Sequence, residues 1–297
     1  MISIETQILK GKPVADAIRR RLTDEVERLA KKNIVPGLAA VLVGDDPASQ
    51  VYIRNKQRAF EGLSCYSETF RLPAEASETE LLELILSLNM NPKFHGILVQ
   101  LPLPKHINSQ NILLNIAPNK DVDGFHPMNL GNLLAGNPQF IPCTPNGVIE
   151  ILKYYNIPVS GRHAVIVGRS NIVGKPMFAL LAQKFEKGNA TVTICHTGTP
   201  DITTFTKKAD IIVAAVGIPH LITGDMITEG VDIIDVGINR VDDDSEKGYH
   251  LDGDVNLDSV LGIANSVTPV PGGVGPMTIA MLLVNTIQSA KLSIPVL

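Results

Sequence analysis

The chain has 297 residues, of which 44% are hydrophobic and 19% charged, values typical of a soluble globular protein long enough for two domains. Its net charge of −4 argues against nucleic acid or an anionic membrane as the main partner. The three cysteines are widely spaced, no apolar run reaches the length of a membrane span, and the amino terminus lacks the pattern of a signal peptide. We therefore expect a cytoplasmic protein without a disulfide framework.

The first part of the chain alternates helical and strand patterns. Apolar residues recur every three or four positions over residues 11–32, which predicts a long amphipathic helix. Ser77 and Glu80 have the spacing of a capping box, so another helix is expected to begin there. This alternation predicts a parallel α/β sheet with short crossovers. The expected strands are 38–43, 64–72 and 95–100. The expected helices are 11–32, one that contains residues 52–56, 78–88 and 108–116.

Residues 117–147 interrupt this alternation. They are rich in proline, glycine and asparagine and show little periodicity, and a connection of this length is typical of a functional segment or an interdomain link. A second alternation follows and predicts a doubly wound nucleotide-binding domain. Its expected strands are 164–167, 191–195, 210–216 and 231–236, and its expected helices are 147–155, 177–185, 202–208 and 277–287.

Tyr52 and Lys56 are four residues apart on the helix expected after the strand 38–43, so their side chains share one face. Open α/β sheets bind ligands beyond the carboxyl ends of their strands. A tyrosine there could stack on a flat ring, and a lysine could act as an acid, a base or a point charge. When the stretch is taken alone, a surface helix with a solvated lysine is the favoured alternative.

A glycine-containing turn follows the strand 164–167 and opens a helix, as a dinucleotide-binding loop does. The first glycine permits the tight turn, and the helix amino terminus offers amides to a phosphate. The pattern Gly168, Ser170, Gly174 nevertheless departs from G-x-G-x-x-G. A plain strand-to-helix turn is therefore an equally good interpretation of this loop alone.

The end of the next strand indicates which dinucleotide is preferred. An NAD site usually places an acidic residue there to bind the ribose hydroxyls, but this strand ends in Cys195, His196 and Thr197. Arg169 lies in the loop opposite. Hydroxyl and cationic groups without a carboxylate suit a 2′-phosphate, which favours NADP over NAD. The alternative is that His196 only caps the strand.

Two further segments are candidate ligand contacts. Residues 271–276 place three glycines between two prolines, which suits either a rigid backbone wall beside a planar ligand or a structural turn. Asp121 and Asp123 would share a face of an extended segment. A carboxylate that hydrogen bonds to an amino-substituted heterocycle is favoured there over a metal site, because no further ligands follow at motif spacing. A solvated acidic turn remains the alternative.

Together these motifs resemble the bifunctional methylenetetrahydrofolate dehydrogenase/methenyltetrahydrofolate cyclohydrolase family. The resemblance follows the family's order over nearly the whole chain, and the serine at position 170 is itself part of the family's pattern. The segments that carry it are 43–56, 96–104, 120–127, 142–145, 168–176, 235–239, 253–255 and 268–278.

The resemblance implies two α/β domains with a cleft between them. The first, residues 1–143, would be a folate-binding catalytic domain, and the second, residues 144–276, a Rossmann-type NADP-binding domain with a parallel sheet. A final helix, 277–297, would pack back onto the first domain. The resemblance also implies a homodimer formed through the cofactor domain, and a role in the one-carbon metabolism that serves purine, methionine and histidine biosynthesis.

The implied activity couples two reactions. NADP oxidises 5,10-methylenetetrahydrofolate to the 5,10-methenyl cation, and hydrolysis then gives 10-formyltetrahydrofolate. By resemblance, Lys56 is the essential residue of the hydrolysis and Gln100 contacts it, while Tyr52 packs on the folate and Asp123 holds the pterin. Because the methenyl cation would repel a charged lysine, we expect Lys56 to act as a neutral amine that helps to deprotonate water.

No metal is expected, because the sequence offers no ligand set at motif spacing, and the resemblance implies further ligand contacts. The other expected folate contacts are Val99, Leu101, Pro271, Gly272, Gly273, Val274 and Gly275. The expected cofactor contacts are Gly168, Arg169, Ser170, Gly174, Thr197 and Ile238.

Three other interpretations are weighed against this one. A dehydrogenase of the same family without hydrolase activity is disfavoured by the presence of Tyr52, Lys56 and Gln100. A different NADP-linked dehydrogenase, such as an amino-acid or shikimate enzyme, is disfavoured by the segments 121–126 and 271–275. A catalytically silent nucleotide-binding subunit is disfavoured by the intact set of polar site residues.

Overall fold

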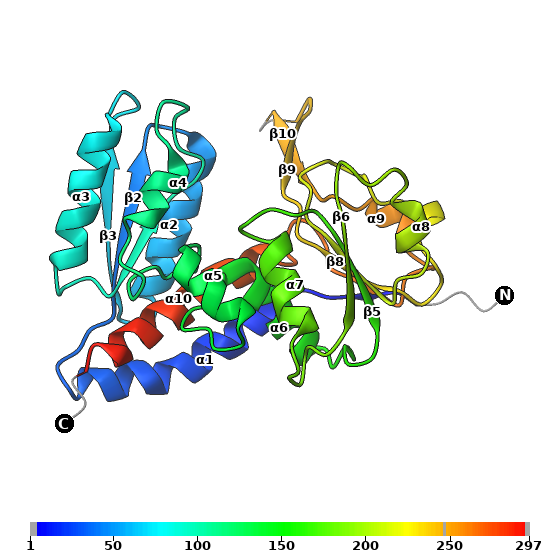
Figure 1. Cartoon of the computed structure of the whole chain (residues 1–297), viewed down its shortest axis with the longest axis horizontal. Helices are drawn as coiled ribbons and strands as arrows, with labels where there is room; N and C mark the ends of the chain where they lie inside the picture. The colour runs from blue at the N-terminus through cyan, green and yellow to red at the C-terminus, as the bar shows by residue number, and fades with distance from the viewer. Residues whose placement is uncertain (1–4, 246–247, 295–297) are drawn as a thin grey trace. The chain divides into compact units, whose positions relative to one another are not determined.

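The computed structural model describes residues 5–245 and 248–294, and the chain divides into two compact units (Figure 1). Unit 1 comprises Met1–Asp16 and Thr144–Thr278, and unit 2 comprises Ala17–Cys143 and Ile279–Leu297. Two long helices, α1 (Gly11–Ala30) and α10 (Gly275–Leu292), contribute residues to both units. Each unit contains a parallel sheet with helices, so the predicted α/β class is confirmed.

Unit 2 is built on a three-stranded parallel sheet. Its order is β3 (Tyr66–Leu72), β2 (Gly37–Val43) and β4 (Gly96–Val99). All of β2 is buried, as expected of a central strand covered on both faces. Alternate β2 residues form a cluster with three apolar residues of α3 (Glu78–Met90), which covers one face. The predicted parallel sheet is therefore confirmed.

The helices of unit 2 begin at side chains that cap them. In α2 (Pro47–Glu61), the Asp46 carboxylate accepts a hydrogen bond from Ser49 N at 2.7 Å. Such a cap satisfies one of the amides that a helix leaves unpaired at its amino end. The predicted capping box of Ser77 and Glu80 is present at the start of α3. Asn108 caps α4 (Ser109–Leu114) in the same way.

The segment 117–147 is more regular than the sequence indicates. It contains a short helix, α5 (Pro127–Leu134), and the first residues of α6 (Cys143–Tyr154). His126 Nδ1 accepts a hydrogen bond from Met128 N at 3.0 Å and so caps α5. The expected start of α6 at residue 147 is four residues late. Pro145 is tolerated in the first turn, because amides there have no partner within the helix.

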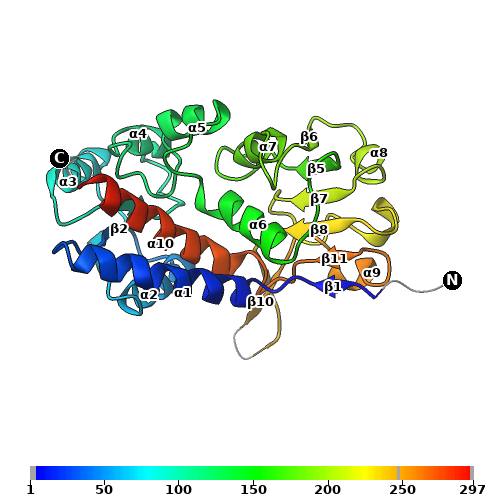
Figure 2. The same ribbon diagram turned by 90° about the horizontal axis from the view of Figure 1, so that it is seen from below.

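Unit 1 is built on a six-stranded parallel sheet. Figure 2 shows β1, β11, β8, β7 and β5 side by side. The chain order reverses at β5, which lies between β6 and β7, as in a doubly wound sheet with a topological switch point. In spatial order the strands are β1 (Gln7–Ile8), β11 (Ser266–Val267), β8 (Asp232–Asp235), β7 (Ile211–Ala214), β5 (His163–Val167) and β6 (Thr191–Cys195).

Short helices and a hairpin complete unit 1. The helices are α7 (Gly174–Ala182), α8 (Thr203–Thr206), the 3₁₀ helix η1 (Gly224–Met226) and α9 (Leu257–Val260). The antiparallel hairpin consists of β9 (Asn239–Asp242) and β10 (Tyr249–Asp252) (Figure 1). The sequence does not indicate this hairpin, because its strands are short and largely polar. The two-residue strands β1 and β11 are too short to show a periodicity.

Within residues 5–245 and 248–294, no helix combines the length and the apolar character that crossing a bilayer requires. The three cysteines, Cys65, Cys143 and Cys195, are buried free thiols.

Candidate active site

The side chain of Lys56 lies inside unit 2 and not on its surface. Only 7% of this residue is exposed, and Nζ donates a hydrogen bond to Gln100 Oε1 at 3.0 Å. Gln100 directly follows β4, where its backbone N donates to Val41 O at 2.9 Å and continues the pairing with β2. The expected contact between the α2 lysine and the glutamine at the strand end is therefore present.

The orientation of the Gln100 amide is fixed by a second hydrogen bond. Its Nε2 donates to Leu101 O at 2.9 Å, which leaves Oε1 directed at Lys56. A neutral amide oxygen accepts a hydrogen bond from an amine without holding a proton on it as a carboxylate would. Tyr52 lies one turn before Lys56 on α2 and is half-buried, and this burial raises its pKa.

Asp123 lies within electrostatic reach of Lys56. The residue is partly exposed, but the surrounding atoms bury its carboxyl group enough to raise its pKa to about 6. Desolvation is the largest cause of this shift, and the charge of Asp121 adds to it, whereas Lys56 acts in the opposite direction. The carboxyl group can therefore gain or lose a proton near neutral pH.

Cys143 belongs to this site, although sequence reasoning assigned it no role. It is buried, and Sγ donates a hydrogen bond to Val122 O at 3.4 Å. Burial, together with the charge of Asp123, raises the pKa of the thiol well above its usual value. Cys143 is therefore a neutral hydrogen-bond donor beside Asp123 and not a nucleophile.

Asn285 of α10 joins the two segments that carry Asp123 and Cys143. Its Nδ2 donates to Val122 O at 2.8 Å and to Ile141 O at 2.9 Å, one residue before Asp123 and two before Cys143. Asn285 is 4% exposed. The sequence signal for this contact is weak, because it consists of one amide on an otherwise apolar helix, distant in the chain from both segments.

Asp121, the other acidic residue of the segment, shapes the backbone. It is 1% exposed and accepts hydrogen bonds from Phe125 N at 3.2 Å, His126 N at 2.8 Å and Asn129 Nδ2 at 2.8 Å. Burial raises its pKa, while these hydrogen bonds act to lower it. The two aspartates thus differ, because Asp121 is occupied within the loop and Asp123 is partly exposed.

In unit 1, the glycines of the loop after β5 are required by close contacts. Gly168 has a φ of +126°, and a Cβ added there would lie 2.1 Å from Ala215 O. A Cβ at Gly174 would lie 2.2 Å from Gly168 O. Ser170 Oγ accepts from Val173 N at 3.1 Å and from Gly174 N at 3.4 Å. These two hydrogen bonds give partners to amides at the start of α7, and they explain why α7 begins three residues earlier than expected.

The remaining expected cofactor residues lie at the carboxyl end of the sheet or beside it. Arg169 and Thr197 are exposed, and Ile238, after β8, is 43% exposed. His196 Nδ1 accepts from Gly198 N at 3.0 Å, which is the capping role considered above as the alternative. A cap of this kind leaves Thr197, between the two, on the surface.

The segment 271–275 is a tight turn that leads into α10. Gly272 has a φ of +106°, and Gly273 N donates to Pro269 O at 2.7 Å. A Cβ added at Gly275 would lie 3.7 Å from Ile238 Cδ1. The expected folate segment therefore lies beside one of the expected cofactor residues within unit 1.

Within residues 5–245 and 248–294, no cluster of three or more histidine, cysteine or acidic side chains could hold a metal ion. Unit 2 thus brings together an amine, an amide and a carboxyl group, and unit 1, taken by itself, carries exposed polar loops. The first group can transfer protons, and the loops can bind an anionic ligand.

Comparisons with known proteins agree with this arrangement. The catalytic-domain model of tetrahydrofolate dehydrogenase/cyclohydrolase matches residues 9–123, and the NAD(P)-binding-domain model of the same family matches residues 142–294. The bifunctional protein FolD of Moorella thermoacetica is 56% identical over 285 residues, which cover 96% of this chain and 99% of that protein.

Solved structures give the same result. The FolD methylenetetrahydrofolate dehydrogenase/cyclohydrolase of Campylobacter jejuni has a TM-score of 0.91 and 46% identity, covering 97% of this chain and 100% of that one. The Trypanosoma brucei FolD, solved with NADP and an inhibitor, has a TM-score of 0.92 and 39% identity, covering 97% and 98%. The chain belongs to the tetrahydrofolate dehydrogenase/cyclohydrolase family.

Proposed function

We propose that this protein oxidises 5,10-methylenetetrahydrofolate with NADP and hydrolyses the resulting 5,10-methenyltetrahydrofolate to 10-formyltetrahydrofolate. The observation that carries the proposal is the buried contact between Lys56 Nζ and Gln100 Oε1, with the carboxyl group of Asp123 nearby. A buried lysine held by a neutral acceptor is suited to acid–base chemistry, which a dehydrogenase alone does not need.

Unit 1 is the proposed cofactor-binding domain. The loop after β5 has the close backbone approach that a dinucleotide phosphate requires, because Gly168 and Gly174 leave no room for a side chain. Exposed Arg169 and Thr197, with no acidic residue at the end of β6, suit the 2′-phosphate of NADP. The Trypanosoma brucei relative, solved with NADP, supports this assignment. NADP, when bound, accepts the hydride that leaves the one-carbon bridge.

Unit 2 is the proposed site of hydrolysis. In this step water forms a bond to the methenyl carbon and loses a proton to the neutral amine of Lys56. The bond from that carbon to N5 then breaks as the new hydroxyl group loses its proton to become the formyl oxygen and N5 takes up a proton, so that the formyl group remains on N10. Gln100 positions the amine, because its oxygen accepts one N–H and leaves the lone pair of nitrogen available for the water proton. The cationic substrate itself disfavours a charged lysine.

Asp123 and Tyr52 are the proposed pterin contacts in unit 2. The partly exposed carboxylate of Asp123 can accept hydrogen bonds from the amino group and ring N–H of a pterin, and half-buried Tyr52 can stack on a flat ring. We also propose Val99, Leu101 and the turn 271–275 as folate contacts, because the family resemblance implies them.

The cellular role is also a proposal. We propose a homodimer formed through unit 1, as the family resemblance implies. We place the reaction in the cytoplasm, because three buried free cysteines fit a reducing compartment. The product would supply one-carbon units for purine, methionine and histidine biosynthesis.

The test uses the purified protein with methylenetetrahydrofolate and either NADP or NAD. Absorbance reports the reduced cofactor and the methenyl intermediate separately. We expect reduction of NADP, a weaker reaction with NAD, and little accumulated methenyl product. A protein that turns over neither cofactor would contradict the assignment, and lasting accumulation of the methenyl product would indicate a dehydrogenase alone.

A further inference from the structure

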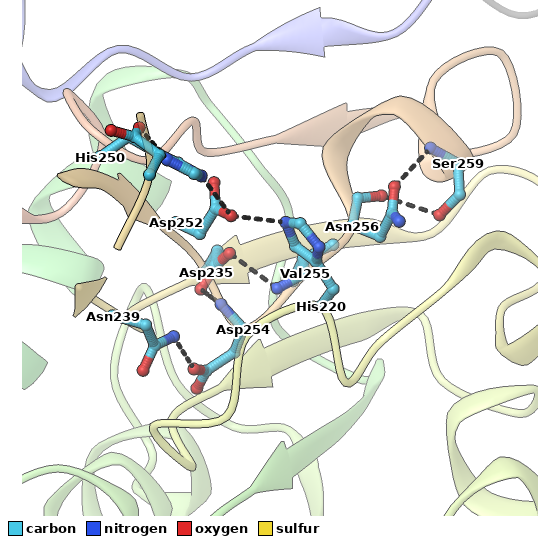
Figure 3. A network of polar contacts seen from close by, with 10 residues as sticks. His220, Asp235, Asn239, His250, Asp252, Asp254, Val255, Asn256 and Ser259 are labelled. Carbon is cyan, nitrogen blue, oxygen red and sulfur yellow. Dashed lines mark hydrogen bonds and ion pairs between the residues drawn. The ribbon is translucent and has the colours of Figure 1, made fainter. Parts of the chain in front are cut away.

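Two carboxylates are buried together in unit 1, at the carboxyl end of β8 and after β10. Asp235 is the last residue of β8 and is 3% exposed, and Asp254 is 0% exposed. Figure 3 shows them side by side, with Asn239 directed at Asp254 and Val255 at Asp235. Neither residue takes part in the reaction proposed above, so another reason is needed for burying two negative charges at this place.

Asp235 fixes the backbone on which Asp254 is carried. Its carboxylate accepts hydrogen bonds from Gly237 N at 2.9 Å, Asp254 N at 3.0 Å and Val255 N at 2.9 Å. Burial raises its pKa to about 6, and the charge of Asp254 adds to this. A Cβ at Gly253 would lie 1.8 Å from Asp235 Oδ2, so a glycine is required at that position. Asp254 is therefore held in one place by its neighbour.

Asp254 in turn holds the turns after two neighbouring strands. After β7, three successive amides donate to its carboxylate, Val216 N at 2.6 Å, Gly217 N at 3.0 Å and Ile218 N at 3.0 Å. After β8, Asn239 Nδ2 donates to it at 2.9 Å. Four donors thus converge on one carboxylate, and the two strands that precede these turns are adjacent in the sheet.

Both turns lie where a doubly wound sheet binds its ligand. β7 pairs with β5 at the switch point of the sheet, and its turn begins at Ala215, whose carbonyl oxygen is the atom that excludes a side chain from Gly168. The turns also carry exposed apolar residues, Ile218 at 49% and Ile238 at 43% exposure. A shift of the turn after β7 would therefore move Ala215 O, which faces the loop at Gly168, and exposed Ile218. A shift of the turn after β8 would move exposed Ile238.

We propose that Asp254 is a positioning residue for the dinucleotide, which sets the turns after β7 and β8 in the geometry that the cofactor requires. This inference rests on the proposed function in which unit 1 binds NADP. It also assigns Ile218, which is 49% exposed and whose amide Asp254 holds, as an apolar contact of the cofactor. Asp254 acts through the backbone that it holds and does not take part in hydride transfer.

The substitution Asp254→Asn tests this proposal with little change of volume. Its NH₂ group replaces one acceptor oxygen, so at least one backbone or side-chain donor loses its partner, whichever way the amide points. We expect the KM for NADP to rise about ten- to a hundredfold, with a much smaller change in kcat at saturating NADP. Hydrolysis of added methenyltetrahydrofolate needs no NADP, so it reports on folded unit 2 in the same sample.

Two variants keep the test decisive if Asp254→Asn does not fold. Asn239→Ala removes only one of the four donors and should raise the KM for NADP several-fold. Asn265→Ala is the matched control. Asn265 Nδ2 donates at 2.7 Å to buried Asp232, which is the first residue of β8 and thus lies at the end of that strand opposite Asp235. If Asn239 had a purely structural role, Asn239→Ala and Asn265→Ala would have similar stabilities and similar KM values for NADP.

The proposal predicts a raised KM for Asn239→Ala but not for Asn265→Ala at comparable loss of thermal stability. An unaltered KM for NADP in folded Asp254→Asn, or equal KM values in the two asparagine variants, would overturn it. Failure of the unsubstituted protein to reduce NADP would instead refute the proposed function, so the two failures are distinguishable.

Discussion

The substitution Gln100→Glu tests the role of a neutral acceptor beside Lys56. The side-chain oxygen lies 3.0 Å from Lys56 Nζ, where a carboxylate would attract a protonated amine by about 5 kcal/mol at an effective dielectric constant of about 20. Gln100 is partly exposed, so solvent screening reduces this to about 1.4–4 kcal/mol. Because this attraction favours the protonated amine over the neutral amine that accepts the water proton, we expect the rate of hydrolysis to fall about 10- to 1000-fold.

The assay follows the decay of methenyltetrahydrofolate absorbance from pH 6 to pH 9, with the rate measured without enzyme subtracted. In the Gln100→Glu variant, hydrolysis should recover as the pH rises, because a more strongly held proton is removed only at higher pH. Gln100→Met is the control of similar size without the charge, and its loss should show no such recovery. Equal activity of Gln100→Glu and the unsubstituted protein, or a loss that does not depend on pH, would refute the reasoning.

Three further predictions follow from buried polar groups and close contacts. The pKa of Asp123 is raised to about 6, above its unfolded value, so ionising its carboxyl group disfavours the folded state. Asp123→Asn should therefore raise the melting temperature at pH 7, while it weakens folate binding. In the unsubstituted protein, kcat/KM for the folate should fall below about pH 6, where the carboxyl group is protonated. Asn285→Ala removes the amide that donates hydrogen bonds to the carbonyl groups of Val122 and Ile141, and it should lower the free energy of unfolding by about 1–3 kcal/mol. Denaturant titration measures this change. An unchanged midpoint would argue against a stabilising role of Asn285. Gly168→Ala places a Cβ against Ala215 O. We expect this variant to lose NADP binding, as measured by titration, and to retain hydrolysis of methenyltetrahydrofolate. A normal affinity for NADP would show that the loop can move to accommodate the side chain.

The shared helix face of Tyr52 and Lys56 could be predicted from the sequence because it follows from helical spacing. The contact between Lys56 and Gln100 and the catalytic role of the lysine came instead from the family resemblance. The structure shows the physical basis of the contact, since Gln100 directly follows β4 at the carboxyl edge of the sheet, where α2 begins after β2. On its sequence stretch alone, a solvated surface lysine was favoured, and its 7% exposure shows that this alternative was wrong.

The supporting residues could not be predicted, because they meet through contacts between distant parts of the chain. Asn285 and Val122 are 163 residues apart, and no periodicity relates an amide on α10 to a carbonyl group in a loop. Cys143 shows the same limit, since a lone cysteine carries no spacing signal until the fold places it beside Asp123. Asp254 follows a polar hairpin that no pattern indicated. Three of its four donors come from the turn after β7, and the fourth is Asn239, the first residue of β9.

The substitution Lys56→Met tests the central claim most directly, when both reactions are measured in one sample of methylenetetrahydrofolate and NADP. Removing the amine should lower hydrolysis at least about a thousandfold, while oxidation keeps at least about a tenth of its rate, so that the methenyl product accumulates as NADP is reduced. The same substitution at exposed Lys31 is the control and should alter neither rate. Parallel loss of both reactions in Lys56→Met, or continued hydrolysis, would contradict the role of Lys56 as the base of the second step.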